Sequence, residues 1–213
     1  MKNVSGAMVR KLYINQVAMA VFGVMVISAA AFMGDELMVL ASLLAIGVYL
    51  FLIYDAMWNA GAKDAARRLR AEDAELDKIR TPFYIVLFAS LFNLGGALIY
   101  LMLRGAISAG GLTEGALVLA GDTVHIIMNY ANSIYNGFAA MLFPHPHYGL
   151  TAQEVAELNA IYGRPTITEL TEPWFYFLIP VPLFATGMLA YYVGASETTL
   201  RKILAEIFKS ANG

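Results

Sequence analysis

Four long apolar stretches, each of a length that crosses a lipid bilayer, constrain this chain more than any other feature. A spanning helix takes about 20 mostly apolar residues, because the hydrocarbon core is about 30 Å thick. Lipid offers the backbone no hydrogen-bond partners, so helices are the expected spanning form. The four stretches are Val17–Met33, Leu37–Tyr54, Pro82–Leu103 and Pro173–Gly194. They predict an all-α, polytopic transmembrane helical bundle that forms one membrane domain over residues 1–213.

The composition supports this fold class and excludes several others. Apolar residues make up 59% of the chain and charged residues 14%, with a formal net charge of −2, whereas soluble domains average about 45–50% and about 25%. A disordered chain, a basic nucleic-acid binder and a disulfide scaffold are therefore excluded. The chain has no cysteine, which removes thiol catalysis and thiolate metal sites. It contains no phosphate-binding or dinucleotide-binding motif, so we expect no cofactor.

A short connection joins the first two spans. Only Gly34, Asp35 and Glu36 separate them, which predicts a tight helical hairpin. The first span also has features of a cleavable signal peptide, because Arg10 and Lys11 precede it and small residues, Ala29 to Ala31, lie near its end. The second span follows at once, and this favours an uncleaved hairpin.

A fifth stretch, Ala116–Phe143, is long enough to cross the bilayer but carries a row of polar residues. We name this row the polar seam: Asp122, His125, Asn129, Asn132 and Asn136. The spacing of +3, +4, +3 and +4 puts all five on one face of a continuous helix. An ionised aspartate in lipid costs about 2.5–3.5 kcal/mol on insertion scales. The seam is therefore expected to border water, a cavity or other polar groups.

The distribution of basic residues predicts the orientation, since Lys and Arg concentrate in cytoplasmic loops. With four spans, only Arg104 and Arg164 of the 14 Lys and Arg lie outside. If the fifth stretch also crossed, Arg104 and the three basic residues of the C-terminal tail would be outside instead. The sequence thus favours a protein of the plasma (inner) membrane with both termini cytoplasmic. It places residues 104–172 outside, with the polar-faced stretch as a re-entrant helix or, alternatively, a fifth span.

Three flanking segments have their own predicted structures. Residues 55–81 mix both signs of charge at helical spacing, which predicts a solvated cytoplasmic helix that continues from the second span. It begins with the unusual run Trp58–Asp64 (WNAGAKD). Residues 196–209 have the periodicity of an amphipathic helix at the membrane surface. A capping box at Thr151 and Glu154 predicts a small extracytoplasmic helical cap over Ala152–Tyr162.

Other polar or helix-breaking residues are weaker candidates for a site. Asn93, with Ala89, Gly96 and Tyr100, forms a second one-sided stripe, on the third span, which predicts helix packing or a cavity shared with the polar seam. Pro180 and Pro182 interrupt the last span, and broken helices line the binding sites of some transporters. His145 and His147 alternate in an extended PHPHY run, which is a weak indication of a metal site.

Three functions fit these features. The sequence favours a non-catalytic membrane component or accessory subunit, with the lipid bilayer and a membrane-protein partner or a second copy of the chain as its partners. The alternative is a small solute or ion transporter or channel, with a polar route lined by residues 122–136. The third is a membrane enzyme that uses Asp122 and His125, which the lack of a catalytic motif disfavours.

Overall fold

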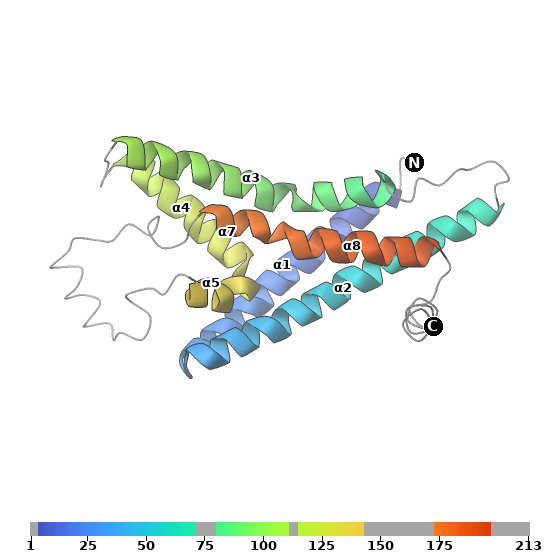
Figure 1. The fold of residues 1–213 in the computed structure, drawn as a ribbon, viewed down its shortest axis with the longest axis horizontal. Coiled ribbons are helices and arrows are strands. Elements are labelled where there is room, and N and C mark those ends of the chain that lie inside the picture. Colours follow the sequence, from blue (N-terminus) through green and yellow to red (C-terminus); the bar gives the residue numbers. More distant parts are fainter. Residues whose placement is uncertain (1–3, 71–79, 111–114, 143–172, 197–213) are drawn as a thin grey trace, which may run out of the picture. The chain divides into compact units, whose positions relative to one another are not determined.

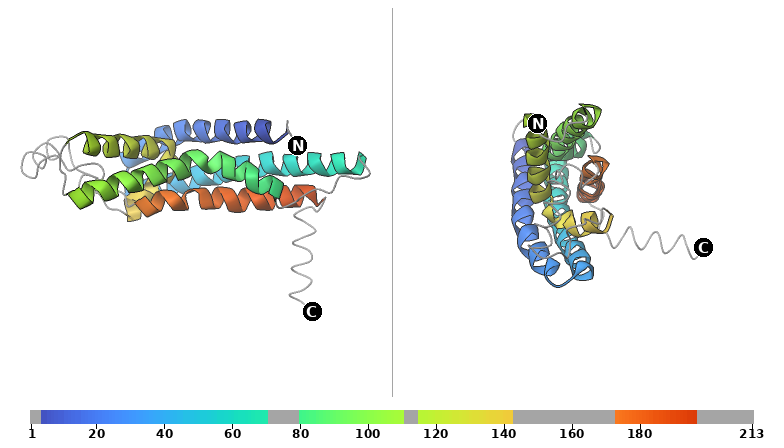
Figure 2. Two further views of the ribbon diagram at one scale, coloured as in Figure 1. Left: turned by 90° about the horizontal axis from the view of Figure 1, so that it is seen from above. Right: turned by 90° about the vertical axis from the view of Figure 1, so that its left-hand side faces the viewer.

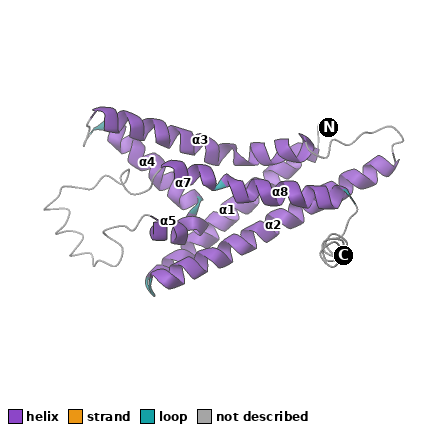
Figure 3. Ribbon diagram, viewed as in Figure 1, coloured by secondary structure: helices purple, strands orange, loops and turns teal. Residues whose placement is uncertain are grey.

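The computed structural model describes residues 4–70, 80–110, 115–142 and 173–196. Nearly all of these residues are helical and none of them forms a strand (Figure 3). Four helical segments in this part of the chain are long and apolar enough to cross a membrane: Gly6–Ala30, Glu36–Ala66, Arg80–Gly110 and Pro173–Ala195. For the described residues, the prediction of an all-helical chain with four helices long and apolar enough to cross a membrane is confirmed.

The helices follow one another along the chain as Figure 1 shows. Their bounds are α1 Val4–Ala31, α2 Asp35–Arg70, α3 Arg80–Gly110, α4 Ala116–Ala131, the 3-10 helix η1 Ser133–Tyr135, α5 Asn136–Leu142, α7 Pro173–Leu178 and α8 Pro180–Ala195. The first three helices extend beyond the apolar stretches from which they were predicted. In particular, α2 continues through the charged segment to Arg70, so the helical prediction for residues 55–81 is confirmed up to that point.

The predicted hairpin between the first two spans forms at Gly34. This glycine has a φ of 120°, a backbone conformation that other residues rarely adopt. Backbone bonds from Met33 N to Ala30 O (2.9 Å) and from Met38 N to Gly34 O (3.1 Å) close the turn. Apolar side chains of both helices then pack together next to it: Val26, Ile27, Ala30, Met38 and Ala41.

The chain divides into two compact units, and each long helix contributes a part to both. The first unit comprises residues 1–15, 49–90 and 181–213. Its described part contains the N-terminal turns of α1, the second half of α2, the first half of α3, and α8. The second unit comprises residues 16–48 and 91–180 and contains the remaining parts of these helices together with α4, η1, α5 and α7.

In the first unit, glycines bring α2 and α8 into close contact. A Cβ atom on Gly61 would collide with the backbone at Tyr191 and Ala195, and one on Gly194 would collide with the backbone at Trp58 and Ala62. Small residues at a helix interface let two backbones approach closely, which is the usual way of packing helices in lipid.

This contact explains the unusual run Trp58–Asp64. Ala60 and Gly61 supply the small interface residues, and Asp64 accepts a 2.7 Å hydrogen bond from the hydroxyl of Tyr191. Asp64 is therefore half-buried against α8, not part of a wholly solvated face as the charge pattern predicted. On the exposed side, Lys11 and Asp55 form an ion pair of 3.9 Å, and exposed pairs of this kind contribute little to stability.

The last span is interrupted as the prolines predicted, but only one of them marks the break. α7 ends at Leu178 and α8 begins at Pro180, with Ile179 in a turn between them. Pro182 lies in the first turn of α8, where the missing N–H would have no partner within the helix in any case.

Several predicted elements lie outside the described residues. These are the extracytoplasmic cap helix at Ala152–Tyr162, the histidines His145 and His147, the end of the charged segment at residues 71–79, and the amphipathic tail beyond Ser196. They stay predictions.

The contact between α2 and α8 yields a stability test. Gly61→Ala should destabilise the protein by about 1–3 kcal/mol, because the new methyl group meets the backbone of α8 and forces the helices apart. The measurement is thermal or denaturant unfolding of the purified protein in detergent. Gly47→Ala is the matched control on the same helix, since nothing lies within 4 Å of its added Cβ. Equal stabilities of the two variants would contradict this packing.

Candidate functional site

The polar seam faces the interior of the second unit. His125 and Asn132 are 2% and 3% exposed, and Asp122, Asn129 and Asn136 are half-buried. The opposite face of α4 carries the exposed apolar side chains Leu119, Ile127 and Tyr130. The seam residues thus lie on the buried side of α4, and its exposed side is apolar.

The seam does not continue along one helix as its spacing predicted. α4 ends at Ala131, Asn132 caps it with φ −113° and ψ 25°, and η1 separates it from α5. Only Asp122, His125 and Asn129 therefore share one α-helical face. The amide nitrogen of Asn132 donates to Met128 O at 2.9 Å, so the side chain itself helps to end the helix. Asn and Ser favour such local bonds to the backbone, which compete with helix continuation.

After this break the chain reverses its direction. α5 turns back toward the end of the unit from which α4 begins, and the further views of Figure 2 agree with Figure 1 on this. Two interhelical bonds fasten the turn: the hydroxyl of Ser133 donates to Ala20 O at 2.7 Å, and Gly137 N donates to the hydroxyl of Ser42 at 2.8 Å. Glycines allow the chain to come this close to α1 and α2. A Cβ on Gly23 of α1 would collide with Ser133, and a Cβ on Gly137 would collide with α2.

A buried aromatic cluster surrounds the imidazole of His125. Its Nδ1 lies 3.1 Å from the hydroxyl of Tyr176 on α7, which donates to this atom when Nδ1 is unprotonated. The ring of Tyr100 on α3 lies 5.4 Å from the imidazole and 5.6 Å from the ring of Tyr176. Three helices thus meet at one titratable side chain inside the second unit.

The stripe on α3 packs against the inner face of α4. Asn93 and Tyr100 are 1% and 0% exposed, and a Cβ added to Gly96 would meet the thioether of Met128. Tyr100 pairs with His125, and Gly96, one turn earlier on α3, pairs with Met128, one turn later on α4. The two helices are therefore antiparallel here.

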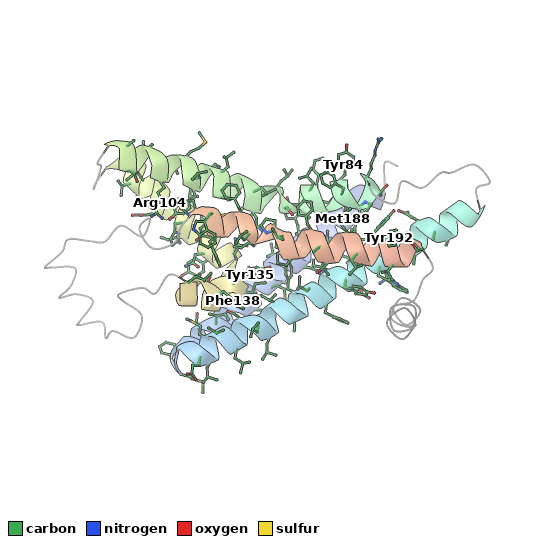
Figure 4. The ribbon with its side chains drawn as sticks, in the orientation of Figure 1. Tyr84, Arg104, Tyr135, Phe138, Met188 and Tyr192 are labelled. Carbon is green, nitrogen blue, oxygen red and sulfur yellow. The ribbon has the colours of Figure 1, made fainter. Side chains whose placement is uncertain are left out.

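Extending this register by one turn in each direction places further polar residues opposite each other. Toward the C-terminus of α4, the register pairs Asn93 with Asn132. Toward its N-terminus, Arg104 lies across from Asp122, and Figure 4 shows Arg104 on the side of α3 where α4 runs. Asp122 is half-buried, and this register predicts that Arg104 is the cation nearest to its carboxylate.

Two buried polar atoms next to the break of α4 have no hydrogen-bond partner among the described residues. They are Oδ1 of Asn93 and the hydroxyl oxygen of Tyr135. Tyr135 N donates to Asn132 O at 2.9 Å, which closes a 3-10 turn and puts both side chains on the same side of that turn. Figure 4 shows Tyr135 beside the start of α5. From the register and this turn we infer that Asn93, Asn132 and Tyr135 lie near one another at the end of α4.

Sequence reasoning missed several residues of this site. Tyr176 could not be recognised from a polar pattern, because it lies in an aromatic run at the start of the last span. Ser133 and Tyr135 fall off the seam on a continuous helix, but the break of α4 turns both inward, and they are 1% and 8% exposed. The sequence Asn132–Ser133 was the one available signal, because both residue types favour turns and caps.

The described residues provide no group of three or more His, Cys, Asp or Glu that could hold a metal ion. The weak metal candidates His145 and His147 lie outside the described part of the chain. A site that joins them to His125 or Asp122 stays a prediction.

No protein-family model, no curated protein and no solved structure matches this chain.

The aromatic cluster yields a second stability test. Tyr176→Phe removes the hydroxyl that bonds to His125 and keeps the ring, so it should destabilise the protein by about 1 kcal/mol. Unfolding of the purified protein in detergent measures this loss. Tyr130→Phe is the matched control, because Tyr130 is 62% exposed, and it should change stability by less than about 0.5 kcal/mol. A Tyr176→Phe protein as stable as the wild type would show that the bond is unimportant.

Proposed function

We propose that the protein is a small ion or solute transporter or channel, and that its polar route runs along the inner face of α4. The observation that carries this proposal is the contact of Met128, one turn before the end of α4, with Gly96 of α3. Asn93 lies in the middle of the apolar stretch Pro82–Leu103, so it belongs near the centre of the bilayer. We infer from the register between α3 and α4 that the C-terminal end of α4 lies at a similar depth.

The length of α4 supports a re-entrant element. Its 16 residues extend about 24 Å at 1.5 Å per residue, less than the hydrocarbon core of about 30 Å. Arg104 and Asp122 lie at the edge of the same apolar stretch, so only the half of α4 beyond Asp122 enters the core. With α5 returning toward the same end, this arrangement favours four spans plus a re-entrant pair.

A helix that ends inside a membrane is a feature of transport proteins for a physical reason. Its last carbonyl groups need partners, and lipid supplies none, so such an end is tolerated only inside protein or beside a water-filled cavity. Half-helix ends are therefore used to bind ions and solutes near the midplane. The inward polar face of α4 and the interruption between α7 and α8 fit this use.

Flux into proteoliposomes tests this proposal. The purified protein should admit at least one of Na⁺, K⁺, protons or a small neutral solute, each followed with a tracer or an internal dye. Asn129→Leu should reduce this flux at least tenfold, because it makes half-buried polar surface on the route apolar. Ile127→Leu, on the exposed face of α4, is the matched control and should leave the flux unchanged. Equal flux through both variants would overturn the proposal.

A non-catalytic membrane component is the second candidate, and the exposure of α1 favours it. Only 22% of the apolar window of α1 is buried within the chain, and Val17, Val21 and Met25 are exposed. A partner subunit or a second copy would cover this face. Folded protein that conducts none of the probes above would favour this function over transport.

A further inference from the structure

We infer that the break of α4 forms a binding site for a monovalent cation, built from the side-chain oxygens of Asn93, Asn132 and Tyr135 at the C-terminal end of α4. The inference deepens the proposed transport function, on which it rests, by naming the chemical class that the route would carry.

The first argument is the unsatisfied oxygen of Asn93. The side chain is 1% exposed, and its Oδ1 has no hydrogen-bond partner among the described residues. Leaving a buried acceptor unpaired costs about 1–3 kcal/mol, and at the centre of a membrane no lipid group can relieve this cost. A bound cation satisfies an amide oxygen directly, as would a donor such as water.

The second argument is that two further side-chain oxygens belong to residues that directly follow the end of α4. Tyr135 contributes a buried hydroxyl without a partner among the described residues. The register places Asn132 opposite Asn93, and because its amide nitrogen donates to Met128 O, only its amide oxygen can serve as a ligand. Carbonyl, amide and hydroxyl oxygens are the ligands that hard cations prefer.

The third argument is electrostatic and decides the charge of the ligand. The C-terminal end of a helix carries a partial charge of about −0.5, which attracts a cation and repels an anion. The three side chains are neutral, and Asp122 lies more than two helical turns before Asn132. Calcium and magnesium sites usually include carboxylates, so this neutral set of oxygens fits a singly charged ion better than a divalent one.

Thermal unfolding of the full-length protein in detergent tests the site without any need for transport. Melting temperatures are compared in LiCl, NaCl, KCl and NH₄Cl, with choline chloride at the same ionic strength as the reference. At least one small cation should raise the Tm by several degrees, and the shift should saturate with concentration, because a ligand that binds only the folded state stabilises it.

Two variants should abolish this shift. Tyr135→Phe removes one oxygen and keeps the ring. Asn93→Leu removes the unpaired acceptor, and in choline chloride it should be as stable as the wild type or more so. Tyr130→Phe, on the exposed face of α4, is the matched control and should keep the full shift. If Asn93→Leu does not fold, Tyr135→Phe alone decides the outcome.

A wild-type Tm that is the same in all five salts would overturn the site and would indicate that only water pairs with these oxygens. A cation shift that survives in Tyr135→Phe and in folded Asn93→Leu would overturn it as well. The flux assay is independent of these results: a cation-dependent Tm without flux would leave the site standing and reject transport. Flux without any cation dependence of the Tm would reject the site alone.

Discussion

The absence of hydrogen-bond partners in lipid is the constraint on which the rest of this structure depends. It makes four apolar stretches helical, and it decides how the polar ones are arranged. α4 and the turn after it carry an aspartate, a histidine and asparagines, and these side chains are buried or half-buried within their unit. Two of these side chains have identified hydrogen-bond partners. His125 bonds with the hydroxyl of Tyr176, and Asn132 bonds with the carbonyl oxygen of Met128. In this region the helices therefore have to pack so that their polar side chains also reach hydrogen-bond partners.

Glycines allow the helices to pack this closely. Gly96 admits Met128 of α4, Gly23 admits Ser133, and Gly61 and Gly194 admit each other's helix backbones. Without a hydrophobic force between helices in lipid, close van der Waals contact and interhelical hydrogen bonds have to stabilise the structure. The antiparallel register of α3 and α4 follows from one such contact and one ring pair, and it relates three polar pairs: Asn93 with Asn132, Tyr100 with His125, and Arg104 with Asp122. The proposals on transport and on a cation both depend on this register.

Much of this arrangement could be predicted from the sequence, because the relevant physics is local or periodic. Hydropathy and length gave the four apolar helices, Gly34 the hairpin, Pro180 the interruption of the last span, and the stripe around Asn93 a buried face of α3. The break of α4 could not be predicted in this way, since the spacing from Asp122 to Asn136 fits an uninterrupted helix equally well. The bond from Asn132 to its own helix and the anchoring of Ser133 on α1 decide against that helix. Tyr176 was missed because one tyrosine in an aromatic run has no periodic signal, and its role depends on which helix is opposite.

The register of α3 against α4 is the most direct target for an experiment, and the natural chain has no cysteine that would interfere. Cysteines placed at positions 93 and 132 should be joined rapidly by oxidation or by a short bis-thiol reagent in native membranes. A pair at 93 and 127 should not react, because Ile127 lies on the exposed face of α4. Efficient linkage of 93 to 132 alone is the result that this account predicts. Linkage of 93 to 127, or of neither position, would show that α4 does not end opposite Asn93 at the centre of the membrane.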